Sequence, residues 1–295
     1  MVSDMTAKDV SDYGEQVTAR CERVLGTVLR AIGAPWRDRV CLVGGLVPRY
    51  LLPGVVDPLT GAHVGSTDVD MALGLAVGGR LGGAYRTLEK NLKGAGLARY
   101  KSSSWQWSVE VDDHVVVLEL LGDDAATPSG TLFRPKVTPP AGSGNLELLC
   151  VRGVELALRD AVVVEREIEL LDGAYSTVQI QIAGLAPFVM LKAAAYLDRR
   201  DPKDVYDLLF VLRNWPGGPK EAAAAIAASP IAAEDLLVDS LARLAGDFSS
   251  ANHAGPRDYE RFVGAAPRSP GAAALRDEAL LIWHEFSRAL SPSTP

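Results

Sequence analysis

Cysteine is scarce in this chain, and its three residues, Cys21, Cys41 and Cys150, form no CxxC spacing and no even set. We therefore expect free thiols in a reducing compartment rather than a disulfide framework. No uncharged stretch approaches the roughly 20 apolar residues that span a bilayer. The first residues are polar and mixed, without the basic and then apolar order of a signal peptide. We expect a cytoplasmic protein with no membrane segment.

Several catalytic signatures are also missing. The four histidines are scattered and pair with no cysteine or serine motif. The chain has no zinc-ligand spacing, no nucleophile elbow and no GxxxxGK[ST] phosphate loop. Positive charge is in short supply as well, because the formal net charge is −7. That charge argues against a protein whose whole surface binds nucleic acid, although a local basic groove stays possible.

The composition is that of a globular protein of one large or two modest domains. The chain has 295 residues, of which 48% are hydrophobic and 23% are charged. Strand-like segments dominate up to about residue 182, and the pattern becomes helical to the end from Pro187. The change of character near Gly184 predicts an α+β protein with a boundary there.

The hydrophobic pattern and the turn residues predict the individual elements. Asp112-Asp113 is expected as a hairpin turn, and Asp201 as the N-cap of a helix with Pro202 at its first position. Loops are expected over 74–83 and 122–144, and a disordered tail over 291–295. The predicted elements are helix 12–33, strand 40–43, helix 84–94, hairpin 105–121, strand pieces 146–151, 161–168 and 175–182, and helices 187–198, 201–213, 219–228, 231–245, 256–263 and 270–290.

The most informative stretch is residues 38–73. The apolar run Val40–Val43 meets Gly44-Gly45, and a later strand candidate carries Asp68 and Asp70. Side chains alternate along a strand, so these two carboxylates share one face. They repel each other unless a cation lies between them, and Mg²⁺ is commonly held by one or two carboxylates together with substrate phosphates. The glycine pair allows a phosphate to approach the backbone and a helix N-terminus.

Further polar residues in apolar surroundings extend this candidate site. Glu119 is a third carboxylate that could bind a second metal ion or act as a base, or be a surface acid of an edge strand. Lys192 lies on an apolar helix, where it could bind phosphates or mark the edge of the core. Asp204 and Asp207 are three residues apart and share a helix face. Asp204 also suits the first turn of a helix without any function.

At these residues the chain resembles a known superfamily. Gly44-Gly45, then Thr67-Asp68-Val69-Asp70, then Glu119, is similar to the polymerase-β-type nucleotidyltransferases, which carry a Gly-Gly or Gly-Ser turn, an Asp-x-Asp strand and a third acid on a later strand. The runs Lys192–Arg199 and Lys203–Leu208 resemble the paired helix motifs of the AbiEii/MenT branch, which contains toxins of bacterial toxin–antitoxin systems. The match covers roughly residues 38–213.

The resemblance implies a fold, an activity and a set of partners. It implies a nucleotidyltransferase fold over 1–185, with a mixed sheet flanked by helices, and an all-helical domain over 186–295 that completes the NTP site and contacts the acceptor. Similar enzymes transfer NMP from an NTP to the 3′ end of tRNA and so inhibit translation. The implied partners are an NTP, tRNA and a cognate antitoxin, and the implied cofactor is Mg²⁺.

The resemblance also assigns roles by position. The third acid is Glu119 where many relatives carry Asp, and Lys203 stands where arginine is common. The implied catalytic residues are Asp68, Asp70, Glu119, Lys192 and Asp207; the implied NTP-binding residues are Gly44, Gly45, Ser66, Lys192 and Asp204; and the implied metal ligands are Asp68, Asp70 and Glu119.

Two other functions are compatible with the same residues. One is a nucleotidyltransferase acting on a small hydroxylated acceptor such as an aminoglycoside, and the other is a non-catalytic nucleotide-binding module that works through a partner. The window from Arg80 to Lys101 holds six basic residues and one acid, Glu89. It could contact an RNA backbone, or be a solvated helix face.

Overall fold

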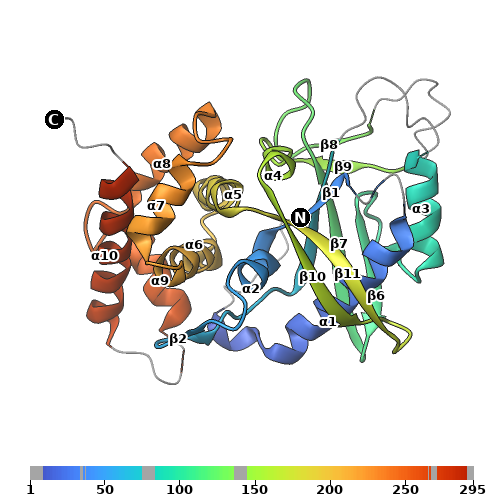
Figure 1. Cartoon of the computed structure of the whole chain (residues 1–295), viewed down its shortest axis with the longest axis horizontal. Coiled ribbons are helices and arrows are strands. Elements are labelled where there is room, and N and C mark those ends of the chain that lie inside the picture. The colour runs from blue at the N-terminus through green and yellow to red at the C-terminus, as the bar shows by residue number, and fades with distance from the viewer. Residues whose placement is uncertain are drawn as a thin grey trace. The chain divides into compact units, whose positions relative to one another are not determined.

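The computed structural model describes residues 9–33, 36, 38–74, 84–135, 145–264, 266 and 271–290. The predicted tail 291–295, most of the predicted loop 74–83 with Arg80, and residues 136–144 of the predicted loop 122–144 lie outside the described residues. Figure 1 shows the elements along the chain.

The chain forms two compact units. One, the sheet unit, consists of Glu15–Val47 and Ser66–Gly184, and the other, the helical unit, takes the described residues of Met1–Gly14, Pro48–Gly65 and Leu185–Pro295. The chain passes from the sheet unit to the helical unit for the last time after Gly184, next to the predicted boundary between 1–185 and 186–295. The segment Pro48–Gly65 groups with the C-terminal helices, although it precedes the sheet strand that carries Asp68 and Asp70. The division of the sequence into two consecutive domains stays a prediction.

A mixed sheet forms the core of the sheet unit, with strands in the order β10-β11-β1-β4-β7-β6-β5. The pairs β1–β11 and β4–β7 are parallel, and the other neighbours on this path are antiparallel. β9 pairs with β7 in parallel and with β8 in antiparallel orientation. The strands are β1 (Val40–Val43), β4 (Asp68–Leu73), β5 (Ala98–Arg99), β6 (Gln106–Val111), β7 (His114–Gly122), β8 (Leu132–Phe133), β9 (Leu148–Cys150), β10 (Ala161–Glu169) and β11 (Tyr175–Ala183).

Two helices of the described residues, α1 (Glu15–Ile32) and α4 (Leu156–Arg159), pack on this sheet, and α3 (Ala84–Gly94) packs on α1. Helix α1 contacts β4, β7, β10 and β11, and the short helix α4 contacts β1 and β11. The contact of α1 follows from its sequence, because one helix face carries buried residues at positions i, i+3, i+4, i+7 and i+11, namely Cys21, Val24, Leu25, Val28 and Ile32. The apolar stripe of α1 therefore closes the core on that face of the sheet.

The helical unit is built from helices that pack through apolar side chains. Helix α5 contacts α6, α7 and α8, while α10 contacts α6, α7 and α9. Helix α2 (Val47–Leu51) begins where the chain enters this unit. The remaining elements of the unit are η1 (Val10–Asp12), β2 (Val56–Asp57), β3 (Gly61–Ala62), α5 (Leu185–Arg199), α6 (Pro202–Asn214), α7 (Pro219–Ala227), α8 (Asp235–Asp247), α9 (Ala254–Val263) and α10 (Ala272–Leu290).

The predicted α+β class is confirmed, with a mixed sheet flanked by helices and a helical C-terminal region. The strand 40–43 and the helix 84–94 have the predicted bounds, and Asp201 caps α6 as expected by accepting from the Lys203 N–H. The short elements β2, β3, β5, β8 and α4 were not predicted, because two to four residues are too few to show a period. Among the described residues, none of the helices combines the length and apolar character needed to cross a membrane.

Candidate functional site

Gly44 and Asp70 lie in direct contact in the sheet unit. Gly44 begins the 3-10 helix η2 (Gly44–Leu46) directly after β1, and its φ is +75°. A Cβ at this position would lie 1.9 Å from Asp70 Oδ2. Only glycine satisfies both conditions, since a side chain would be strained at that φ and would collide with the carboxylate. The glycine turn therefore places backbone, not a side chain, against Asp70.

Three carboxylates lie along one face of the sheet, and we call Asp68, Asp70 and Glu119 the carboxylate row. Strands β4 and β7 are parallel neighbours, with Asp70 directly opposite Glu119 and Asp68 opposite Val117. Directly opposite residues share a face, and all three acids are partly exposed while Val69, Leu118 and Met71 are buried. The predicted third acid therefore stands beside the Asp-x-Asp pair on the neighbouring strand.

Neutral hydrogen-bond donors hold two of these carboxylates. Ser66 Oγ donates to Asp68 Oδ1 at 2.6 Å, and Gln106 Nε2 on β6 donates to Glu119 Oε1 at 2.7 Å. The buried thiol of Cys21 on α1 donates to the Ser66 carbonyl at 3.5 Å. Burial, with a contribution from Asp68 and Asp70, raises the pKa of Cys21 to about 12, so the thiol stays protonated at neutral pH.

The chemistry of the carboxylate row fits a magnesium ion. Its donor atoms are all carboxylate oxygens, the ligands that Mg²⁺ prefers. Within the described residues, no set of three or more His, Cys, Asp or Glu side chains is gathered so that it could hold a metal ion as it stands. In proteins, Mg²⁺ is commonly held by one or two carboxylates together with substrate phosphates.

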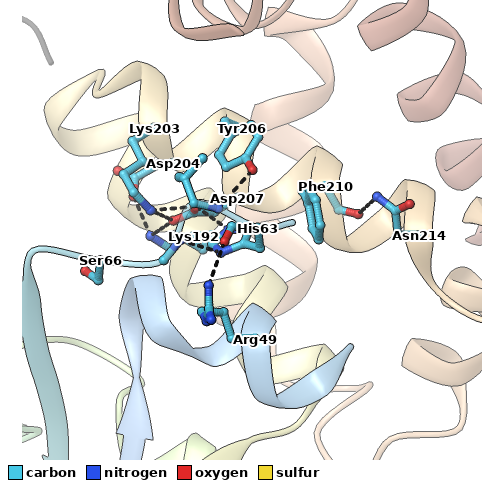
Figure 2. A network of polar contacts seen from close by, with 12 residues as sticks. Arg49, His63, Ser66, Lys192, Lys203, Asp204, Tyr206, Asp207, Phe210 and Asn214 are labelled. Carbon is cyan, nitrogen blue, oxygen red and sulfur yellow. Dashed lines mark hydrogen bonds and ion pairs between the residues drawn. The ribbon is translucent and has the colours of Figure 1, made fainter. Parts of the chain in front are cut away.

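A second group of charged side chains lies inside the helical unit (Figure 2). We call it the buried ionic cluster, and its members are His63, Lys192, Lys203, Asp204 and Asp207, each at most 7% exposed. Lys192 Nζ on α5 lies 2.9 Å from Asp204 Oδ1 and 2.6 Å from Asp207 Oδ2 on α6. Lys203 Nζ lies 2.7 Å from Asp207 Oδ1. Arg199, more than half exposed, adds two hydrogen bonds of 2.8 Å to Asp204.

Lys192, Asp204 and Asp207 are held in their charged forms because each has a partner of opposite sign. Burial lowers the pKa of Lys203. Burial works to lower the pKa of Lys192, but Asp204 and Asp207 outweigh it and raise that pKa. Burial likewise works to raise the pKa of Asp207, and Lys192 and Lys203 outweigh it and lower that pKa. Removing one partner would leave a buried charge uncompensated, which is far more costly than the pair itself.

His63 is neutral and joins the loop before β4 to helix α6. Its Nδ1 accepts from the Gly65 N–H at 3.0 Å, so its proton lies on Nε2, which contacts Asp207 Oδ1 at 2.9 Å. Burial lowers the pKa of His63 to about 4, despite the opposing effect of Asp207. The ring also stacks on Tyr206, and Arg49 donates to the His63 carbonyl at 3.2 Å. These contacts hold the segment His63–Gly65 in place within the helical unit.

The structure places the predicted site residues in two sets. Gly44, Gly45, Ser66, Asp68, Asp70 and Glu119 belong to the sheet unit, and Lys192, Asp204 and Asp207 belong to the helical unit. In the first set, Ser66 hydrogen-bonds to Asp68, and Asp70 lies against Gly44 and opposite Glu119. In the second set, Lys192 pairs with both aspartates. The predicted meeting of both sets on one triphosphate stays a prediction.

Sequence reasoning missed His63, Arg49, Gln106 and Cys21. His63 and Asp207 are 144 residues apart, and no local pattern connects them. The partner of Glu119 could have been predicted from the sequence. In a hairpin with a two-residue turn at Asp112-Asp113, the residues equally distant from the turn are opposite each other, and these include Gln106 and Glu119.

No protein-family model and no curated protein sequence matches the chain. A solved structure that resembles it is that of the CD-NTase CdnG from Bradyrhizobium diazoefficiens in complex with GTP. The resemblance covers 94% of this chain and 92% of that one, with 13% sequence identity and a TM-score of 0.23. A likeness at this level carries no argument about function, so any functional conclusion depends on the residues of this chain.

Proposed function

We propose that this protein is a metal-dependent nucleotidyltransferase that transfers NMP from an NTP to a hydroxyl acceptor. The observation that carries the proposal is the carboxylate row, in which Asp70 and Glu119 are directly opposite on parallel neighbours and Asp68 shares their face. Gly44, which lies against Asp70 without a side chain, supports it. Three acids on one sheet face beside a glycine turn have no evident structural purpose, because like charges directly opposite destabilise a sheet.

In this proposal, Asp68 and Asp70 hold Mg²⁺, and Glu119 contributes the third carboxylate. The bound ion would neutralise charge on the triphosphate and on the departing pyrophosphate. Ser66 keeps Asp68 oriented through its 2.6 Å hydrogen bond. A carboxylate of the row accepts the proton of the acceptor hydroxyl. The backbone of the Gly44-Gly45 turn is the proposed contact for phosphate oxygens, through its N–H groups.

The buried ionic cluster supplies the proposed contacts to the NTP from the helical unit. An ammonium group has three N–H donors, and within the described residues Asp204 and Asp207 take two of those of Lys192. We assign the third to a phosphate oxygen. Asp207 has several donors of its own, because Lys192, Lys203 and His63 all contact it. We therefore assign to Asp207 the orientation of Lys192 rather than proton transfer.

The finer proposal concerns the acceptor. We propose RNA, specifically the 3′ end of tRNA, with inhibition of translation and neutralisation by an antitoxin, on the basis of the sequence motifs given above. Arg86, Lys90 and Lys93 recur at helical spacing and are all exposed on α3, which suits a phosphate backbone. Lys93 also pairs with Glu89 at 3.0 Å, so the stripe is partly neutralised.

The test is transfer of radioactive label from α-³²P-labelled NTPs to purified tRNA and, separately, to aminoglycosides. The wild type is compared with Asp70→Asn and Glu119→Gln, and Glu110→Gln, an exposed acid on β6, is the matched control. We expect labelled tRNA with the wild type and with Glu110→Gln, and a loss of at least about 100-fold in the two site variants, since each removes a charge from the proposed metal site.

Other outcomes identify the alternatives. Label on the aminoglycoside and none on tRNA would replace the RNA acceptor by a small hydroxylated one. No label on either acceptor from any NTP, together with growth inhibition that survives Asp70→Asn, would show a non-catalytic module and refute the enzyme.

A further inference from the structure

The side chain of Gln106 lies in the same row as the proposed catalytic acids, although no motif includes it. Gln106 opens β6 and is directly opposite Glu119 on β7, which in turn is directly opposite Asp70 on β4. All three side chains therefore emerge on one face of the sheet at the same level. All three are also partly exposed, so this level of the sheet faces away from the core.

The contact between Gln106 and Glu119 has a defined direction. Gln106 Nε2 lies 2.7 Å from Glu119 Oε1, a short distance for a bond from an amide to a carboxylate. An ionised carboxylate only accepts, so the amide must be the donor. The bond engages one oxygen of Glu119 and restricts rotation of the carboxylate about its last side-chain torsion.

The backbone of Gln106 is itself held in place. The Gln106 carbonyl accepts from the Tyr100 N–H at 3.0 Å, and its N–H donates to Ser103 Oγ at 3.2 Å. The next residue, Trp107, is fully buried beneath the guanidinium of Arg99, which lies 4.1 Å from the ring centroid. The amide is thus presented to Glu119 from a fixed strand end rather than from a loop.

The chemical type of this partner is informative. A lysine or arginine opposite Glu119 would also orient the carboxylate, but it would cancel the negative charge that attracts a cation. A glutamine supplies the donor and adds no charge of its own to the carboxylate row. Residues that orient metal ligands in this way typically change metal affinity by about 10–100-fold when they are removed.

We infer that Gln106 is a positioning residue for Glu119, which orients this carboxylate toward a divalent cation shared with Asp70. The inference rests on the proposed function, since it assumes that the carboxylate row binds metal. It gives Gln106 no contact with substrate and no part in proton transfer.

The experiment measures Mn²⁺ binding to the full chain by electron paramagnetic resonance, without nucleotide, and NMP transfer at varied Mg²⁺. Gln106→Met keeps the length of the side chain and removes the donor, and Gln106→Lys keeps a donor and adds a positive charge. The matched control is Gln179→Met on β11, where another glutamine lies directly opposite a glutamate, Glu165, in the exposed part of the sheet. Thermal unfolding of each variant checks that it folds.

We expect about a tenfold weaker Mn²⁺ affinity for Gln106→Met and a larger loss for Gln106→Lys, with Gln179→Met equal to the wild type. The Mg²⁺ concentration for half-maximal transfer should rise by the same factor in Gln106→Met, and kcat at saturating Mg²⁺ should fall less. A merely structural role would lower thermal stability without this selective change in metal dependence.

Failure of the inference is distinct from failure of the proposed function. If the wild type binds Mn²⁺ and Asp70→Asn does not, while Gln106→Met binds it as tightly as the wild type, the role of Gln106 is refuted and the metal site stands. If the wild type neither binds Mn²⁺ nor transfers label, the proposed function itself is refuted.

Discussion

At the residue scale, the contact between Gly44 and Asp70 means that any side chain introduced at position 44 would destabilise the fold. In Gly44→Ala the backbone must keep a φ of +75° and the new Cβ would meet the Asp70 carboxylate. The left-handed backbone alone costs roughly 1–2 kcal/mol, and displacement of the carboxylate adds to it. We expect the free energy of unfolding, measured by urea denaturation, to fall by more than the cost of the left-handed backbone alone.

Gly130→Ala is the matched control for this prediction. Gly130 also has a positive φ, +79°, but a Cβ there would meet nothing within 4 Å. The free energy of unfolding of Gly130→Ala should therefore fall only by the cost of the left-handed backbone. Equal losses in the two variants would show that Asp70 moves aside freely and that Gly44 does not constrain it.

His63 makes the stability of the protein depend on pH between about 4 and 6.5. The unfolded chain takes up a proton on this histidine near pH 6.5, whereas burial lowers the pKa in the folded protein to about 4. The unfolded state binds more protons in this window, so stability falls as the pH falls. The two pKa values of His63 differ by about 2.5, which corresponds to a loss of at most about 3 kcal/mol in the free energy of unfolding.

The measurement is urea unfolding of the wild type and of His63→Gln at several pH values from 7 to 4. We expect the wild type to lose stability across this range and His63→Gln to lose less, from a lower starting value at pH 7. His114→Gln, at an exposed histidine, should follow the wild type. Parallel curves for the wild type and His63→Gln would contradict the assignment.

At the scale of elements, the start of helix α6 places the acids of the buried ionic cluster. Asp201 accepts from the Lys203 N–H at 3.0 Å, and Pro202 occupies the first helical position. Asp201→Ala removes this cap, and caps of this kind contribute about 1 kcal/mol. We expect the free energy of unfolding to fall by that amount, while Asp239→Ala, at an exposed aspartate inside α8, changes it little. A negligible loss at Asp201 would mean that packing alone fixes the start of α6.

In the sheet unit, the hairpin of β6 and β7 determines the positions of Glu119 and Gln106. Its turn residues Asp112 and Asp113 have φ values of +49° and +60°, the conformation that two-residue hairpins favour. The tight turn fixes the pairing register, and the register puts Gln106 opposite Glu119. A slip of one residue would move Glu119 to the buried face.

At the scale of the whole molecule, the three thiols report whether the sheet unit opens. Cys21, Cys41 and Cys150 are free and fully buried, and burial raises the pKa of Cys41, like that of Cys21, to about 12. Because the thiolate is the reactive form, the folded protein should react very slowly with DTNB and the denatured protein should give all three thiols. Ser102→Cys, at an exposed site, should add one fast thiol. A fast thiol in the wild type would reveal local opening of the sheet unit.

The sequence by itself determined the class of the fold and most of the local structure. Local signals were strong where they are repeated or chemically specific, as in the stripe of α1, the Asp201-Pro202 helix start and the alternation of β7, where Glu119 falls on the less buried face. It also placed Asp68 and Asp70 on one strand face, because that follows from the period of two alone.

Only the tertiary structure decided which strands are neighbours and which charges meet. The parallel pairing of β4 with β7 brings Asp70 opposite Glu119 across 49 residues of chain, and no local pattern specifies that pairing. The same is true of His63 and Asp207, and of the grouping of Pro48–Gly65 with the C-terminal helices. Periodicity acts over a few residues, whereas these contacts arise from the burial of distant apolar faces and from the need to pair every buried charge.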